Sequence, residues 1–254
     1  METAPQTSIR YICSDGVLLE IGDKRILMDG LIRTQLKMYR PMPQSIIEAL
    51  EQHIPPFDRI DIAIGSHWHP DHFYAKTVEQ CLRSHPETTV VTTPDAMARI
   101  HCPLSNTVVM DLDPLTCGKV EVDGVTIIGF RAKHMGEQFA DVNNVMFTVE
   151  YGGKRFLHTG DTPAELDIFT RYAACVGSEL DALIAAFPFI ARMSTEPVIR
   201  DAIHPKMILA VHLPQAEKDP FGWLLGAERN AERYRQRGYD IRMLKTTEDI
   251  VYLD

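Results

Sequence analysis

The stretch "DIAIGSHWHPDHFYAK", residues 61–76, crowds three histidines and an aspartate into residues 67–72. The whole chain contains only 10 histidines in 254 residues. At that frequency the pattern His-x-His-x-Asp-His arises by chance in roughly one such chain in a thousand. Composition does not account for the cluster, so the cluster predicts a site with a chemical role.

The expected backbone explains how these side chains would meet. The apolar run "IAIGS" predicts a buried strand, and the extended backbone after it points residues i and i+2 the same way, so His67 and His69 should converge. The proline that comes next favours a turn. Asp71 and His72 would then begin a helix over 73–84 and face the same space. The alternative is that Asp71 only caps this helix while the histidines form a solvated loop.

Three further candidates follow predicted strands elsewhere in the chain. His134 comes after "VTIIGFRAK", Asp161 lies in "LHTGDT", and His212 lies in "MILAVHLP". Each has an ordinary alternative role: His134 as a turn residue, Asp161 as the N-cap of a helix over 163–175, and His212 as the end of a strand. Because loops after strands often carry chemistry, the three together with the histidine cluster predict one site.

Apolar spacing and turn residues predict strands mixed with helices along the whole chain. Helices are predicted over 43–54, 73–84, 94–101, 163–175, 195–203 and 222–237, and strands over 17–21, 25–30, 59–66, 125–130, 144–150, 155–161, 181–187, 206–212 and 249–253. No linker rich in Pro, Ser or Gly separates the halves, so we expect a single domain over 1–254. Two mixed halves are compatible with a two-sheet sandwich with helices outside.

The composition is typical of a soluble globular protein, and the net charge favours a small-molecule substrate over nucleic acid. Hydrophobic residues make up 45% and charged residues 24% of the chain, and the mean hydropathy is -0.12. No apolar run approaches the roughly 20 residues of a spanning helix, and no signal peptide pattern is present, so we expect a cytoplasmic location without membrane association. The net charge of -9 disfavours nucleic acid as a partner. The sequence does not indicate an oligomeric state.

The cysteines are five in number and widely spaced, with no Cys-x-x-Cys. We therefore expect free and mostly buried thiols at Cys13, Cys81, Cys102, Cys117 and Cys175. Neither a disulfide framework nor a thiolate zinc site is indicated.

The candidate residues together resemble the pattern of the metallo-β-lactamase superfamily of metal-dependent hydrolases, from about residue 9 to 253. In chain order that pattern is a strand-end Asp, His-x-His-x-Asp-His, a His, an Asp and a His. The matching residues are Asp29 in "ILMDG", His67, His69, Asp71, His72, His134, Asp161 and His212. The resemblance implies an α/β fold, the four-layer αββα metallo-β-lactamase sandwich.

By this resemblance the chain binds two divalent metal ions. One ion would be held by His67, His69 and His134 and the other by Asp71, His72 and His212, with Asp161 bridging both. Zn²⁺ is expected, with Mn²⁺ or Fe²⁺ as alternatives, because the ligands are imidazoles and carboxylates without a thiolate. A hydroxide shared by the ions would attack the substrate, with Asp71, Asp161 and His212 as catalytic residues and either aspartate as proton acceptor.

Several residues around this pattern keep two interpretations. Asp29 either fixes a ligand imidazole or the loop that carries it, or is a plain turn residue at a strand end. Trp68 either lines the pocket or packs under the ligand loop. A basic turn before the first predicted helix contains Arg33, Lys37, Tyr39 and Arg40. These residues either bind an anionic group of the substrate or form solvated surface.

The residues 144–214 are loosely similar to the branch of the superfamily that contains L-ascorbate-6-phosphate lactonase. The first functional hypothesis is therefore a dinuclear metal-dependent hydrolase that cleaves a small ester or lactone, with or without a phosphate group. A second hypothesis is a phosphodiesterase or nuclease related to ribonuclease Z, since the same ligands serve phosphoryl transfer. A third is a non-catalytic, metal-stabilised binding protein.

Overall fold

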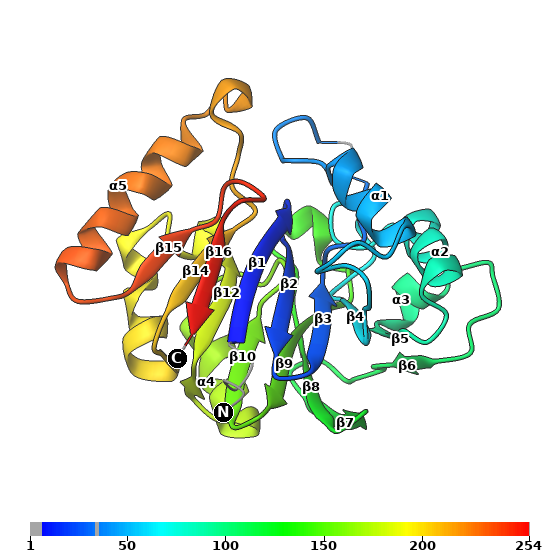
Figure 1. Ribbon diagram of the computed structural model, residues 1–254. Coiled ribbons are helices and arrows are strands. Elements are labelled where there is room, and N and C mark those ends of the chain that lie inside the picture. The colour runs from blue at the N-terminus through cyan, green and yellow to red at the C-terminus, as the bar shows by residue number, and fades with distance from the viewer. Residues whose placement is uncertain (1–6, 34–35, 254) are drawn as a thin grey trace, which may run out of the picture. The chain divides into compact units, whose positions relative to one another are not determined.

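A computed structural model describes residues 7–33 and 36–253 of the chain. The backbone divides into two compact units. Figure 1 labels the helices and strands that the units contain. Unit 1 comprises residues 1–111 and 245–254, and unit 2 comprises residues 112–244. Each unit contains one seven-stranded sheet with helices, so the predicted α/β class is confirmed. No helix in the described part of the chain has both the length and the apolarity needed to cross a membrane.

The sheet of unit 1 combines an antiparallel meander with a parallel half. Its strand order is β16 (Ile250–Leu253), β1 (Thr7–Cys13), β2 (Gly16–Ile21), β3 (Lys24–Met28), β4 (Ile62–Gly65), β5 (Thr89–Thr92) and β6 (Thr107–Val109). β1, β2 and β3 are antiparallel neighbours, and β3 to β6 are parallel. The last strand of the chain pairs with the first, which places the C-terminal segment in unit 1.

Three helices of unit 1 pack on one face of this sheet: α1 (Gln44–Glu51), α2 (Ala75–Ser84) and α3 (Pro94–Met97). The core between them takes buried residues from strands β1 to β5 and the apolar stripe of each helix. Its strand residues include Leu18, Leu27, Ala63 and Val90, and its helix residues include Ile46, Leu50, Val78, Cys81 and Ala96. This core holds the segments on either side of the histidine motif.

The sheet of unit 2 has the order β15 (Ile241–Met243), β14 (Ile208–Val211), β12 (Ala182–Ala186), β10 (Lys154–His158), β9 (Asn144–Tyr151), β8 (Val125–Ala132) and β7 (Cys117–Val122). β10, β12, β14 and β15 are parallel, and β7 to β10 form an antiparallel meander. A small second sheet pairs β11 (Glu179–Leu180) with β13 (His204–Pro205). Short turns of helix lie at η1 (Glu137–Phe139), η2 (Phe187–Phe189), η3 (Met193–Thr195), η4 (Val198–Ala202) and η5 (Ala216–Lys218).

Buried tyrosines join the two helices of unit 2 to their neighbours. On α4 (Leu166–Val176), the Tyr172 ring meets Phe130 edge-on at 5.8 Å, and its hydroxyl lies 2.8 Å from the Thr148 hydroxyl. On α5 (Trp223–Gln236), the Tyr234 hydroxyl lies 2.9 Å from the Thr195 hydroxyl. Each polar tip therefore has a partner although its ring is buried, as buried tyrosines require.

The strand directions bring the candidate residues to one edge within each unit. In unit 1, β1, β3 and β4 run the same way and are followed by Asp15, Asp29 and the histidine motif. In unit 2, β8, β10, β12 and β14 share a direction, and the segments after them contain His134, Asp161, Phe187 and His212. Carboxyl ends of parallel strands are where mixed α/β folds build sites.

Most predicted elements are present, with shifted ends. The predicted helix over 195–203 is wrong, because this segment forms a short 3-10 turn followed by a single π-helical turn. The predicted helix over 163–175 begins only at Leu166. Strands β1, β5, β6, β7, β11, β13 and β15 were not predicted, since most of them have few residues or border a turn.

The prediction of five free thiols is wrong for two of the cysteines. Cys117 on β7 and Cys175 on α4 are joined by a disulfide, while Cys13, Cys81 and Cys102 are free. The two partners are 58 residues apart, and only the packing of α4 beside β7 brings them together. Spacing along the chain therefore contained no sign of this bond.

We predict that denatured, unreduced protein exposes three reactive thiols and that reduction raises the count to five. A chromogenic thiol reagent measures both values. In a Cys117→Ser variant the counts before and after reduction should be equal, because Cys175 has lost its partner. Five reactive thiols in the wild-type protein before reduction would show that the bond does not form.

Candidate metal centre

The carboxylate of Asp29 organises the ligand loop of unit 1. Its Oδ1 accepts the backbone N–H of Ser66 at 2.7 Å, and its Oδ2 accepts the Ser66 hydroxyl at 2.5 Å. The same Oδ2 lies 2.8 Å from Nδ1 of His72. Asp29 is buried and has a left-handed φ of 45°. Of its two interpretations the structure therefore favours the first, in which Asp29 fixes a ligand imidazole and its loop.

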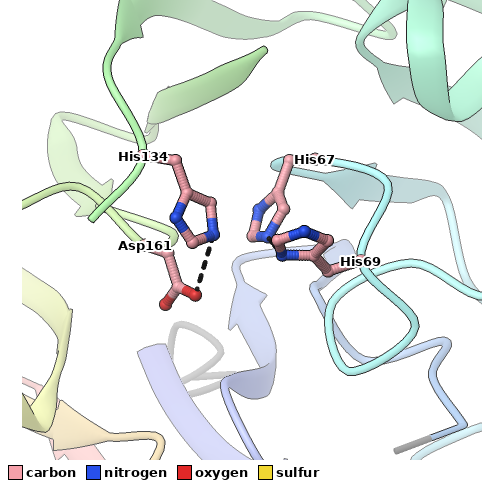
Figure 2. Close-up of side chains that lie close together, drawn as sticks. All are labelled: His67, His69, His134 and Asp161. Atoms are coloured by element: carbon pink, nitrogen blue, oxygen red, sulfur yellow. Dashed lines mark hydrogen bonds and ion pairs between the residues drawn. The ribbon is translucent and has the colours of Figure 1, made fainter. Parts of the chain in front are cut away.

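His67 and His69 converge within unit 1, as the alternation of extended backbone predicted. Nε2 of His67 lies 3.0 Å from Nδ1 of His69 (Figure 2). Because the Ser66 hydroxyl donates to Asp29, it is left to accept a hydrogen bond from Nδ1 of His67, 3.0 Å away. That tautomer leaves the Nε2 lone pair of His67 to act as a metal ligand.

The second half of the motif lies after a turn in which the N–H of His72 donates to the carbonyl of His69. Asp71 and His72 are buried, and each offers a ligand atom within 4.8 Å of the other. The helix begins later than predicted, at Ala75 with Tyr74 as N-cap. Asp71 is therefore not a helix cap, and that alternative is excluded.

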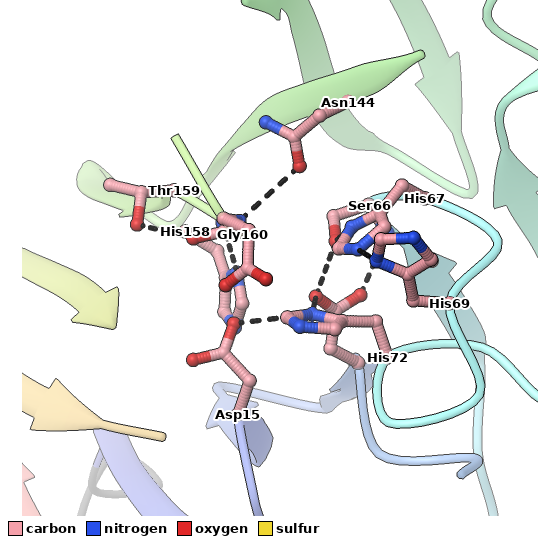
Figure 3. Close-up of polar contacts among 12 residues, drawn as sticks. Asp15, Ser66, His67, His69, His72, Asn144, His158, Thr159 and Gly160 are labelled. Atoms are coloured by element: carbon pink, nitrogen blue, oxygen red, sulfur yellow. Dashed lines mark hydrogen bonds and ion pairs between the residues drawn. The ribbon is translucent and has the colours of Figure 1, made fainter. Parts of the chain in front are cut away.

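Asp15 is a buried carboxylate of unit 1 that sequence reasoning missed. Its Oδ2 lies 3.5 Å from Nδ1 of His72, so this imidazole faces two carboxylates (Figure 3). Burial, together with the charges of Asp15 and Asp29, raises the pKa of the neighbouring Cys13 thiol. Burial and these two charges therefore favour the neutral thiol at Cys13.

The ligand candidates of unit 2 are joined through both side chains and backbone. Nε2 of His134 lies 3.2 Å from Oδ2 of Asp161 (Figure 2). Nδ1 of His134 lies 2.6 Å from the Met135 carbonyl, and the N–H of Met135 donates to the Asp161 carbonyl at 2.8 Å. The ring thus donates from Nδ1 and directs Nε2 to the carboxylate, as in a metal-ligating histidine.

Asp161 is not the cap of α4, because Glu165 holds the N-cap position and no side chain caps this helix. The turn that presents Asp161 is supported by His158, a residue of the same motif that sequence reasoning did not single out. Nδ1 of His158 accepts the N–H of Gly160 at 3.1 Å, and the N–H of Asp161 donates to Oδ1 of Asn144 at 3.3 Å (Figure 3). Gly160 takes a φ of 50°, which glycine adopts at little cost.

His212 comes directly after β14 and is buried, with a φ of 55°. A left-handed conformation is uncommon for a residue with a side chain, and such strain persists where the surrounding structure imposes it. Asp29 shares this feature at the end of β3. Asp29 and His212 therefore both take a left-handed conformation directly after a strand.

The donor set suits a divalent transition metal. Two ligand atoms on a tetrahedral zinc ion, each about 2.0–2.1 Å from the metal, lie about 3.3 Å apart. The His67–His69 pair at 3.0 Å and the His134–Asp161 pair at 3.2 Å match this separation. All seven predicted ligands are found in candidate metal-binding groups of the described residues, and so are Asp15, Asp29 and His158.

Trp68 packs beside the ligand loop and supports His69. Its ring meets the His69 imidazole edge-on with centroids 4.7 Å apart. The Arg99 guanidinium lies 3.9 Å over the Trp68 ring. The indole is thus held between a ligand candidate and a cation, which fits its interpretation as a packing residue.

In the basic turn, one arginine forms hydrogen bonds within unit 1, and two other basic residues are exposed. Nε of Arg40 donates to the Lys245 carbonyl at 2.9 Å, and the Arg40 carbonyl accepts the N–H of Ser14. Arg33 and Lys37 are exposed, and the Arg33 guanidinium lies 5.8 Å from the centre of the Tyr74 ring. Arg40 therefore has a structural role, and Arg33 and Lys37 remain the candidates for an anion clamp.

Solved structures with the same fold cover nearly the whole chain at low identity. The metallo hydrolase Igni18 from Ignicoccus hospitalis KIN4/I is 14% identical with a TM-score of 0.64, over 98% of this chain and 99% of that one. The isothiocyanate hydrolase from Delia radicum gut bacteria is 13% identical with a TM-score of 0.63, over 97% and 99%. The diiron β-hydroxylase CmlA from Streptomyces venezuelae is 12% identical with a TM-score of 0.67, over 99% of this chain but 55% of its own.

A comparison of the sequence with family models shows the family of this chain. No curated protein matches the chain. The family model described as "Beta-lactamase superfamily domain" matches residues 8–212, which is more than half of the chain and includes every predicted ligand. The chain therefore belongs to the β-lactamase superfamily and has the metallo-β-lactamase fold that its sequence predicted.

Proposed function

We propose that this protein is a metal-dependent hydrolase that opens a small lactone or cleaves a small ester. The observation that carries the proposal is the pairing of ligand atoms within each unit. His67 with His69, and His134 with Asp161, have the separation of two ligands on one ion. Such pairs of lone-pair donors repel one another unless a cation or a shared proton lies between them.

The seven ligands divide into two sets, as the family pattern suggests. We assign His67, His69 and His134 to one divalent cation and Asp71, His72 and His212 to a second, with Asp161 shared. Zn²⁺ is the proposed metal because imidazole dominates the set, and Mn²⁺ or Fe²⁺ are alternatives. The hydrogen bonds from Nδ1 of His72 and His134 support this assignment, since they orient Nε2 toward a ligand role.

When bound, the two cations supply Lewis-acid polarisation of the substrate carbonyl and lower the pKa of water to near neutrality. The chain's own residues orient the reaction and accept its proton. The carboxylates of Asp71 and Asp161 are the proposed proton acceptors, because they lie in the ligand set itself. The Asp29 carboxylate keeps His72 in one tautomer. This mechanism needs no Ser or Cys nucleophile.

Two alternatives remain in the same fold. A phosphodiesterase or nuclease uses the same ligands, but the net charge of -9 opposes a nucleic-acid backbone. A non-catalytic metal-binding protein would be expected to have lost ligands, and all seven are present. The lactonase branch is preferred on the loose similarity of residues 144–214. Turnover of a lactone, a chromogenic ester and bis(p-nitrophenyl) phosphate, with and without chelator, separates the three.

Purified protein should contain up to two transition-metal ions per chain, measured by elemental analysis. Because the metal binds the folded state preferentially, chelation should lower the melting temperature. The stabilisation lost is about 4 kcal/mol if the free metal had been at about a thousandfold over its dissociation constant. Protein that takes up no metal after soaking, or melts identically after confirmed metal removal, would refute a preformed site.

Replacement Asp161→Ala should leave the chain folded by circular dichroism but reduce the metal content toward one ion or fewer. Removing a shared carboxylate leaves two dications with less compensating charge. Turnover should fall on the order of a thousandfold or more. The matched control is Asp167→Ala, which removes an exposed carboxylate from the first turn of α4 and should change neither property. An Asp161 variant with two metals and normal turnover would end the dinuclear proposal.

We also propose that the substrate carries an anionic group held by Arg33 and Lys37. The double replacement by Ala should raise KM for a carboxylated ester about tenfold more than for its neutral analogue, since one charge-assisted contact is worth roughly 1.5 kcal/mol or more. Steady-state kinetics on the two esters measure this difference. Equal effects on both substrates would mean that the basic turn is solvated surface.

A further inference from the structure

Phe187 occupies a strand end between two predicted ligands in the sheet of unit 2. β12 lies between β10 and β14, and these outer strands lead to Asp161 and His212. Register pairs Ala186 with Val211, so Phe187 and His212 leave neighbouring parallel strands side by side. At this edge of the sheet, β12 therefore contributes an apolar ring where its neighbours contribute metal ligands.

A row of aromatic rings extends from this strand end to the surface. The Phe187 ring centroid lies 5.8 Å from that of Trp223, and the Trp223 ring stacks on Phe221 at 4.7 Å with planes 24° apart. The exposed fraction rises along the row from 5% at Phe187 to 43% at Trp223 and 64% at Phe221. The row thus begins beside a ligand candidate and ends in solvent.

The exposed rings are held in place by a polar turn. The Asp219 carboxylate accepts the N–H of Phe221 at 3.2 Å and the N–H of Leu224 at 2.7 Å. This turn leads into α5 in the loop coloured orange in Figure 1, and the same segment begins at His212. A stacked pair of rings on an ordered turn that leaves its apolar area in water is typical of a binding surface.

A second exposed ring lies beside another ligand candidate of unit 2. The Phe139 ring meets the His134 imidazole edge-on, with centroids 4.9 Å apart, and is 37% exposed. The segment after β8 therefore combines a histidine with an aromatic ring, and the register places Phe187 next to His212 at the ends of β12 and β14. Flat apolar rings next to imidazoles favour contact with the apolar part of a substrate over a second charged group.

We infer that Phe187, Trp223 and Phe221 form a subsite for an apolar chain of the substrate. This inference rests on the proposed hydrolase function and names its substrate class: a lactone or ester with an alkyl or aryl substituent. The reacting carbonyl lies at the ligands, and the substituent extends past Phe187 onto the stacked rings. We choose an apolar chain of the substrate because the row of rings begins at the end of β12, next to His212.

The kinetic test compares γ-butyrolactone with γ-nonalactone, which shares the ring but carries a pentyl side chain. The double replacement Phe221→Ala and Trp223→Ala should reduce kcat/KM for γ-nonalactone about tenfold more than for γ-butyrolactone, mainly through KM. The control Leu225→Ala removes an exposed apolar side chain of α5 and should leave the ratio between the lactones unchanged. Equal losses on both lactones would overturn the subsite.

A binding test does not depend on turnover. The chain has two tryptophans, so in a Trp68→Phe variant Trp223 alone reports by fluorescence. Nonanoate should shift its emission to shorter wavelength, and butyrate should not. A shift in protein that opens neither lactone would refute the hydrolase but support the subsite. If the protein opens both lactones but nonanoate does not shift the Trp223 emission, the subsite is wrong and the hydrolase proposal stands. The same conclusion holds if the emission shifts only when nonanoate self-associates, which light scattering detects.

Discussion

The buried carboxylate of Asp29 is the contact on which the ligand loop of unit 1 depends. It binds the backbone and hydroxyl of Ser66 and Nδ1 of His72, so it holds both ends of the histidine motif. Its own position needs Gly16, because a Cβ there would lie 2.8 Å from the Asp29 carbonyl oxygen. A loop fixed in this way has already lost the conformational freedom that metal binding would otherwise have to remove.

In unit 2, backbone hydrogen bonds and a histidine hold the loops that carry the candidate ligands. There the backbone of Met135 donates to the Asp161 carbonyl, and His158 supports the turn before Asp161. The ligand candidates of unit 2 leave strands that share one direction in one sheet. Parallel carboxyl ends lie at a common edge, so the sheet itself sets the spacing of the ligand-bearing loops.

The candidate ligands and the proposed substrate subsite lie in different parts of the fold. The candidate ligands are polar groups that follow strands of the two large sheets. The aromatic row of Phe187, Trp223 and Phe221 lies in turns that can vary without disturbing the sheet. Solved structures with this fold include an isothiocyanate hydrolase and a diiron β-hydroxylase at 12–13% identity. The fold therefore does not define the reaction. The turns beside the candidate ligands have to supply the differences in substrate and reaction.

The sequence by itself determined the α/β class, the family and the convergence of His67 with His69, because a dense local motif and the two-residue period of extended chain are properties of neighbouring residues. The roles of Asp29 and Asp161 stayed open, since each residue type also suits a turn or a cap. Only the tertiary structure showed Asp29 against His72, Asp15 beside it, and the bond from Cys117 to Cys175. These contacts join distant segments, and their partners are chosen by packing of strands and helices rather than by spacing along the chain.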